Sequence, residues 1–246
     1  MSKFDKNFES RTVANPPLQQ SSFVFFPEEE EICKRMLQNP ELFCRGAKDA
    51  LAAQGKKLGQ RRRFLRACLE TSAKGVRQIA VFANDFAKTL PKSVFGVGNG
   101  EAYLLPLGIL FEQMKDYENG LNQVIVKLDR LCQPDPFDPA RFALLESVIP
   151  EANVKTRAEK AAGEAETIYR EAMALSREIE SFCQTVIEAF FSKAGDAADL
   201  EHDAANMRFG KLSALCAELE NAAARFAGTW ETRANDSKKS KGTAKP

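Results

Sequence analysis

Residues 154–190 read VKTRAEKAAGEAETIYREAMALSREIESFCQTVIEAF, and their apolar side chains recur at alternating steps of four and three residues. The stripe consists of Val154, Ala158, Ala161, Ala165, Ile168, Ala172, Leu175, Ile179, Phe182, Val186 and Ala189. A heptad stripe of this length, with no proline inside it, is typical of a long helix that buries a narrow seam against partner helices. At about 1.5 Å per residue the helix would be roughly 55 Å long, so we expect an elongated molecule.

Helix start signals define two more helices before this stretch. Pro27 is followed by four glutamates, which predicts a short helix running to about Gln38, because proline fits a first helical turn and acids suit its positive end. Asn39 and Pro40 then form a second start signal, with asparagine as the cap and proline as the first helical residue. The apolar spacing that follows predicts a long helix over about 40–90.

Further helices are predicted around the central stretch. Apolar spacing indicates a helix over about 101–132 and a short one over 141–148, with prolines between them. Gly195 and Asp196 predict a tight turn, because glycine commonly ends a helix and aspartate caps the next one. A final helix is then expected over about 197–233.

The predicted turn is too short for anything but an antiparallel hairpin. Trp230 should therefore pack near residues 158–165. The predicted fold class is all-α, an elongated antiparallel coiled-coil bundle with kinked long helices. We expect this bundle to span 27–233, after an irregular segment over 1–26 and before a disordered basic tail over 234–246.

Composition excludes several classes of protein. The formal net charge is +1, which excludes a globally basic nucleic-acid binder, and we expect no nucleic-acid partner. No apolar run approaches 18 residues, so no transmembrane helix is predicted. The N-terminus lacks the apolar core of a secretory signal. We therefore expect a cytoplasmic protein.

Side chains that could carry catalysis or hold a metal are sparse. The single histidine, His202, lies between Glu201 and Asp203, which is typical of a solvated surface residue. The six cysteines show no Cys-x-x-Cys spacing, and four of them lie on or beside apolar stripes, so we expect reduced thiols in the core. The sequence predicts no enzyme, no cofactor and no metal site.

Two basic segments are the strongest local features. Their cations are Lys56, Lys57, Arg61, Arg62, Arg63 and Arg66 in the first, and Lys155, Arg157 and Lys160 in the second. Three consecutive arginines span about 200° of a helix, so they cannot all lie on one stripe. This density predicts a patch for lipid headgroups, phosphates or an acidic partner, and a solvated helix face explains it equally well.

An unbroken apolar run precedes the first helix. It consists of Phe23, Val24, Phe25 and Phe26, and it fits neither a helix face nor an exposed strand. The run either folds back onto the helical body and fills a groove, or it serves as an anchor for a membrane or a partner.

The layout resembles a BAR domain, the crescent-shaped module of membrane-associated dimers, and most closely the BAR domains found in Arf GTPase-activating proteins. The resemblance covers the block Asn39-Pro40-Glu41-Leu42-Phe43 at the start of the first long helix. It also covers Leu104–Leu131, the interrupted stretch that reaches Phe142, and the basic segment over 155–160.

The resemblance implies three long helices, over about 40–90, 101–193 and 197–233, joined along their length into a homodimer. It also implies that lysine and arginine on the concave face contact the membrane. The first hypothesis is therefore a non-enzymatic, dimeric, peripherally membrane-associated scaffold. The alternative is a helical-bundle adaptor that binds other proteins and no lipid.

Overall fold

The computed structural model describes residues 27–90, 101–202 and 210–239, and within these ranges the chain forms helices and no strand. The all-α prediction is confirmed for this part of the chain. The elements in chain order are α1 Pro27–Gln38, α2 Pro40–Thr89, α3 Glu101–Leu128, α4 Ala140–Val148, η1 Pro150–Ala152, α5 Lys155–Phe182, η2 Cys183–Glu188, α6 Ala189–His202 and α7 Gly210–Lys239. The predicted starts of α1 and α2 at their prolines are confirmed.

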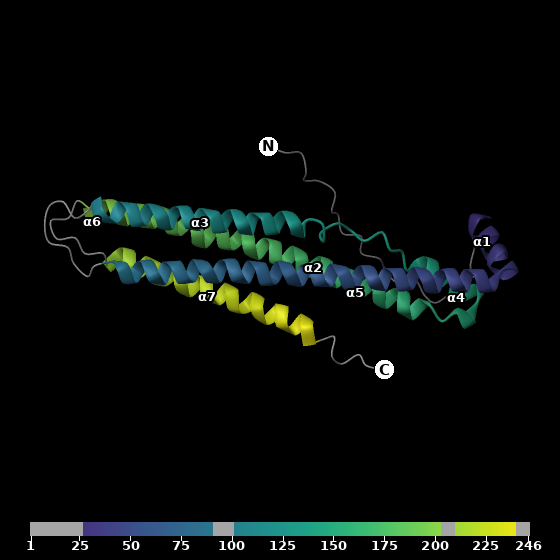
Figure 1. The fold of residues 1–246 in the computed structure, drawn as a ribbon. Coiled ribbons are helices and arrows are strands. Elements are labelled where there is room, and N and C mark those ends of the chain that lie inside the picture. Colours follow the sequence, from purple (N-terminus) through teal and green to yellow (C-terminus); the bar gives the residue numbers. More distant parts are fainter. Residues whose placement is uncertain (1–26, 91–100, 203–209, 240–246) are drawn as a thin grey trace, which may run out of the picture.

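α2 is the axis of the molecule. It is a single helix of 50 residues that runs along most of the elongated body (Figure 1). α5 lies beside α2 in the same direction, because Leu51 and Val154 share one cluster near the start of both helices and Arg62 pairs with Glu164 further along. These two parallel helices form the centre of the bundle.

α3 and α7 run in the opposite direction and lie on opposite sides of the central pair (Figure 1). The direction of α7 follows from its contacts with α2, where Arg77 pairs with Glu231 and Glu70 pairs with Lys238. The described part of the molecule thus has four long helical segments of alternating direction.

The core follows a seven-residue repeat along α2, since Leu51, Leu58, Leu65, Ile79 and Phe86 are all buried. A larger cluster of buried residues joins α2, α3, α5, α6 and α7. A smaller cluster joins α1, the start of α2, α4 and the start of α5 at one end of the body. Regular heptad burial explains why so long a helix packs against its neighbours over its whole length.

The helix over 101–193 implied by the resemblance is divided in the structure. Prolines between residues 134 and 150 interrupt the backbone, and Asn153 takes a left-handed conformation with φ of 48°. α4 and η1 fold within this interruption. α5 then returns antiparallel to α3, and the continuing helical segment brings Phe190 into an edge-on ring contact with Phe111.

The predicted turn at Gly195 and Asp196 is wrong, because α6 continues through both residues to His202. Glycine inside a helix costs about 1 kcal/mol relative to alanine. The adjacent Ala194 is completely buried and Phe190 nearly so, and this packing outweighs the local cost. α7 begins only at Gly210.

The later start of α7 changes its register relative to the predicted one. Trp230 was predicted near residues 158–165, but its Nε1 donates a hydrogen bond to Glu178 at 2.7 Å. α7 also continues to Lys239, past the predicted helix end at 233. The first residues of the predicted tail over 234–246 are therefore helical.

Candidate functional site

The first basic segment divides between two sides of α2. On one side, Lys57 and Arg61 reach Asp135 in the segment that follows α3. Lys57 Nζ lies 2.8 Å from Oδ1 of Asp135, and Arg61 Nη1 lies 3.5 Å from Oδ2. Gln54 Nε2 donates to the same carboxylate at 3.0 Å. These contacts tie the segment after α3 to the side of α2.

The Asp135 carboxylate is nearly enclosed, with 6% of its side chain exposed. Burial alone would raise the pKa of Asp135, but hydrogen bonds from Lys57 and Gln54 and the charge of Lys57 outweigh it and hold the pKa below its ordinary value. Arg61 Nη2 also donates to the Leu131 carbonyl at 2.8 Å. Lys57 and Arg61 therefore both contact the segment after α3, and Asp135 offsets part of their charge.

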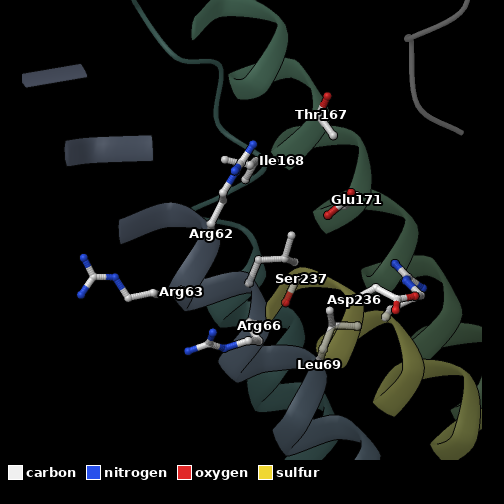
Figure 2. Close-up of a pocket in the computed structure, with 11 residues that line it drawn as sticks. Arg62, Arg63, Arg66, Leu69, Thr167, Ile168, Glu171, Asp236 and Ser237 are labelled. Carbon is white, nitrogen blue, oxygen red and sulfur yellow. The ribbon is translucent and has the colours of Figure 1, made fainter. Parts of the chain in front are cut away.

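On the other side of α2, Arg62, Arg63 and Arg66 line a groove that α5 and α7 complete (Figure 2). The groove has a volume of about 380 Å³. Its remaining lining residues are Leu65, Leu69, Thr167, Ile168, Glu171, Arg233, Asp236 and Ser237.

Carboxylates balance the arginines of this groove. Arg62 Nη2 lies 3.3 Å from Glu164 Oε1, and Arg66 Nε lies 3.8 Å from Glu70 Oε1. Glu171 adds a further acid to the lining. The groove therefore contains paired charges and has little surplus positive charge to attract an anion.

Arg233 of α7 is a groove residue that the sequence reasoning missed. Its Nη1 lies 2.7 Å from Glu178 Oε2, and the same carboxylate accepts the hydrogen bond from Trp230. Trp230 and Arg233 lie three residues apart and so share one side of a helix. That spacing is visible in the sequence, but it points to Glu178 only when the register of α7 is known.

α7 covers one stripe of α2 and then ends. Three α2 residues at seven-residue spacing contact α7 side chains: Glu70 contacts Lys238, Arg77 contacts Glu231, and Asn84 contacts Glu220. Lys56 and Arg63 continue the same stripe at the same spacing toward the start of α2. Since Lys238 reaches Glu70, Lys56 lies beyond the described end of α7, and Arg63 lies at that end, in the groove that Asp236 and Ser237 also line.

α5 adds two cations to this bare surface. Arg157 and Lys160 lie seven and four residues before Glu164, so all three share the side of α5 that faces Arg62. A Cβ placed on Gly55, beside Lys56, would meet no atom within 4 Å, so this position of α2 is open among the described residues. We call this surface the uncovered seam, and its cations are Lys56, Arg62, Arg63, Arg157 and Lys160.

The structure separates the nine predicted membrane-binding residues into three groups. Five form the uncovered seam, where Glu164 is the carboxylate on the same side of α5. Lys57, Arg61 and Arg66 have carboxylate partners within the fold. Lys155 lies about 200° around α5 from Arg157, and its backbone N–H donates to Glu146 at 2.6 Å.

The thiols in the described ranges are all free, as predicted. Cys68, Cys183 and Cys216 are buried. Burial raises the pKa of Cys183 to about 12 and that of Cys216 to about 11, so both remain protonated at neutral pH and are poor nucleophiles. They pack as small apolar side chains.

Two predicted features lie outside the described residues: the run Phe23–Phe26 and the side chain of His202. Among the residues that are described, no cluster of histidine, cysteine and carboxylate side chains has the arrangement of a metal site. Within the same ranges, no helix combines the length and apolar character needed to span a bilayer.

Comparison with protein-family models, with curated proteins and with solved structures finds no match to this chain. The geometry of the uncovered seam therefore carries the functional argument.

Proposed function

We propose that this protein is a non-enzymatic, peripherally membrane-associated module of the cytoplasm that binds anionic membranes through the uncovered seam. The observation that carries the proposal is the surplus of positive charge there. Five exposed cations lie on two parallel helices here, and among the described residues the one in an ion pair is Arg62, with Glu164. The rest of the chain offsets this surplus, since the net charge is only +1.

The physics of the seam suits a lipid surface. Each lysine or arginine near an anionic bilayer contributes about 1 kcal/mol, and the attraction falls off within a Debye length. The seam follows two parallel helices, so its cations are spread along the body and reach several headgroups at once. Binding should therefore require anionic lipid and weaken strongly with salt.

The proposal includes the dimeric, BAR-like mode of action that the resemblance implies. Its support is the long, helical body with antiparallel neighbouring helices (Figure 1). The chain departs from the three-helix layout, because α3 and α5 are separate antiparallel helices. The proposal therefore rests on the charge of the seam and the elongated shape.

The test is co-sedimentation with vesicles of anionic and of neutral lipid, at low and at physiological salt. The seam variant replaces Lys56, Arg63, Arg157 and Lys160 with alanine and leaves the Arg62–Glu164 pair intact. We expect this variant to lose most of its binding to anionic vesicles. We expect the unmodified protein not to bind neutral vesicles.

A matched control removes the same charge elsewhere. Its alanine substitutions fall on Lys74, Lys115, Lys127 and Arg130, which are exposed and have no ion-pair partner among the described residues. The control should bind like the unmodified protein. Equal losses in both variants would show that binding follows net charge alone, and a seam variant that binds normally would overturn the proposal.

A helical-bundle adaptor remains the second candidate, and one observation favours it. Ile109 and Val126 of α3 are large apolar side chains that are 47% and 67% exposed. A protein partner could cover them. Absence of vesicle binding under every condition, together with a partner lost on replacing these two residues, would support this function instead.

A further inference from the structure

Two leucines flank the joint between α1 and α2, at the end of the elongated body (Figure 1). Leu37 is 64% exposed and Leu42 is 66% exposed, although the adjacent Met36 and Ala47 are buried in the small cluster. The joint therefore buries one apolar side and leaves another in water. The two leucines are five residues apart in the chain, and covering them with another apolar surface would be favourable.

Leu42 lies on the same stripe of α2 as the seam cations. Counting by sevens from Leu42 leads through Asp49 to Lys56 and Arg63. α2 keeps this period relative to the core, because Leu51 and Leu58 are both buried. Leu42 thus faces the same way as Lys56, about 20 Å further toward the end of the body.

The charges beside Leu42 balance, and the surplus cations on this side of α2 begin at Lys56. Arg45 and Lys48 are exposed within two turns of Leu42, against Glu41 and Asp49. With the seam beyond them, the outer side of α2 has an apolar end followed by a cationic length. Interfacial helices bind anionic membranes by combining insertion of apolar side chains with contact between cations and headgroups.

We infer that Leu42, together with Leu37, inserts into the acyl boundary of an anionic bilayer while the uncovered seam contacts the headgroups. The inference rests on the proposed function and adds a second, apolar contact to it. It assigns the anchor to the α1–α2 joint, within the described structure. The charge complementarity of Lys56 and Arg63 favours a lipid surface over an apolar protein partner.

The first test is a variant with Leu37→Ser and Leu42→Ser, measured on the same anionic vesicles. We expect binding to weaken about tenfold, because transfer of leucine from water to an apolar phase is lost. Thermal stability should change little, since both side chains are exposed in the free protein. The matched control carries Ile109→Ser and Val126→Ser on α3 and should bind normally.

The two proposals fail in different ways. If the leucine variant binds like the unmodified protein while the seam variant does not, the inserted anchor is wrong and the electrostatic site stands. If both variants bind normally, the membrane site itself is wrong. A leucine variant with a changed molecular mass in the absence of lipid would identify the joint as a protein interface and overturn the anchor.

Depth can be measured directly with tryptophan. The chain has one tryptophan, Trp230, and it is completely buried, so bromine-labelled lipids should leave its fluorescence unquenched. Leu42→Trp should add emission that brominated acyl chains quench. Val126→Trp, at a similar exposure on α3, should add emission that they do not quench. Unquenched emission from position 42 on bound vesicles would contradict insertion.

Discussion

Asp135 shows how one side chain decides the role of its neighbours. Lys57 and Arg61 look in the sequence like members of a single basic patch, yet both reach the Asp135 carboxylate, as does Gln54. Asp135 lies 78 residues after Lys57 in the chain. Local pattern reasoning finds the cations but cannot find a partner that only the folded chain brings near, so it overstates the free charge of the segment.

The residue-scale prediction is that Asp135→Asn destabilises the protein by about 1–2 kcal/mol at neutral pH, because Arg61 is then left with an uncompensated, largely buried charge. Lys57 adds little to this cost, since it is 45% exposed and solvent screens it. The measurement is urea unfolding followed by the emission of Trp230. Asp116→Asn, at an exposed position of α3, is the control and should change stability little.

The same substitution predicts a pH dependence. Because the pKa of Asp135 is lower in the folded chain than in the unfolded chain, the carboxylate stabilises the fold above the unfolded-state pKa. This contribution is lost as the pH falls through the folded-state pKa. The stability difference between the unmodified protein and Asp135→Asn should therefore shrink below about pH 4. A difference that stays constant down to acid unfolding would contradict the stabilising role of the Asp135 carboxylate.

At the scale of the helix, the ends that the sequence predicts well are those with local signals. Pro27 and the Asn39-Pro40 pair mark their helix starts through backbone chemistry that needs no tertiary contact. Gly195 carries an equally local stop signal, but packing of the residues around it prevails and α6 continues. The continuation of α6 past Gly195 delays the start of α7. This delay sets the register of α7 and the position of Arg233 in the groove.

The element-scale prediction is that Gly195→Ala stabilises the protein by about 0.5–1 kcal/mol, because alanine loses less backbone entropy inside a helix. The added Cβ would meet no atom within 4 Å. At a tight turn with left-handed backbone the same substitution would destabilise instead. Calorimetry should show a rise in Tm of a few degrees at most.

Gly46→Ala is the matched control for this prediction. Gly46 lies inside α2, where the sequence and the structure both place a helix, and a Cβ there also meets nothing within 4 Å. Both substitutions should raise Tm. A rise for Gly46→Ala with a fall for Gly195→Ala would restore the predicted turn and the shorter register of the last helix.

At the scale of the whole molecule, heptad spacing correctly predicts an elongated body. It does not give the relative directions of all the helices. The stripe that starts at Val154 is largely buried through Phe182, but the π-helix η2 then moves burial from the predicted Val186 and Ala189 to Ile187 and Phe190. The spacing also does not show how α3 connects to α5. Periodicity reports which side of a helix is buried and leaves open which neighbour buries it. That is why the uncovered seam, where a neighbouring helix ends, could not be read from the sequence.

The weak affinity expected of a single seam makes the oligomeric state important for the proposed function. Five cations less one carboxylate, at about 1 kcal/mol each, give roughly 4 kcal/mol, which corresponds to a Kd of about 1 mM. Two seams on the same side of a dimer would give about 8 kcal/mol, or a Kd of about 1 μM. Useful membrane affinity from charge alone therefore requires a dimer that presents both seams to one bilayer.

The whole-molecule prediction is that the protein sediments at twice its chain mass of 27.3 kDa at micromolar concentration, and that vesicle binding rises steeply over the range in which dimers form. The seam variant should still dimerise, because the proposed function places its substituted cations against lipid and not against the second copy. A protein that stays monomeric and still binds anionic vesicles with micromolar affinity would overturn the dimer. Loss of the dimer in the seam variant would show that the seam joins two copies of the chain, and the cations would then be assigned to that interface in place of the membrane.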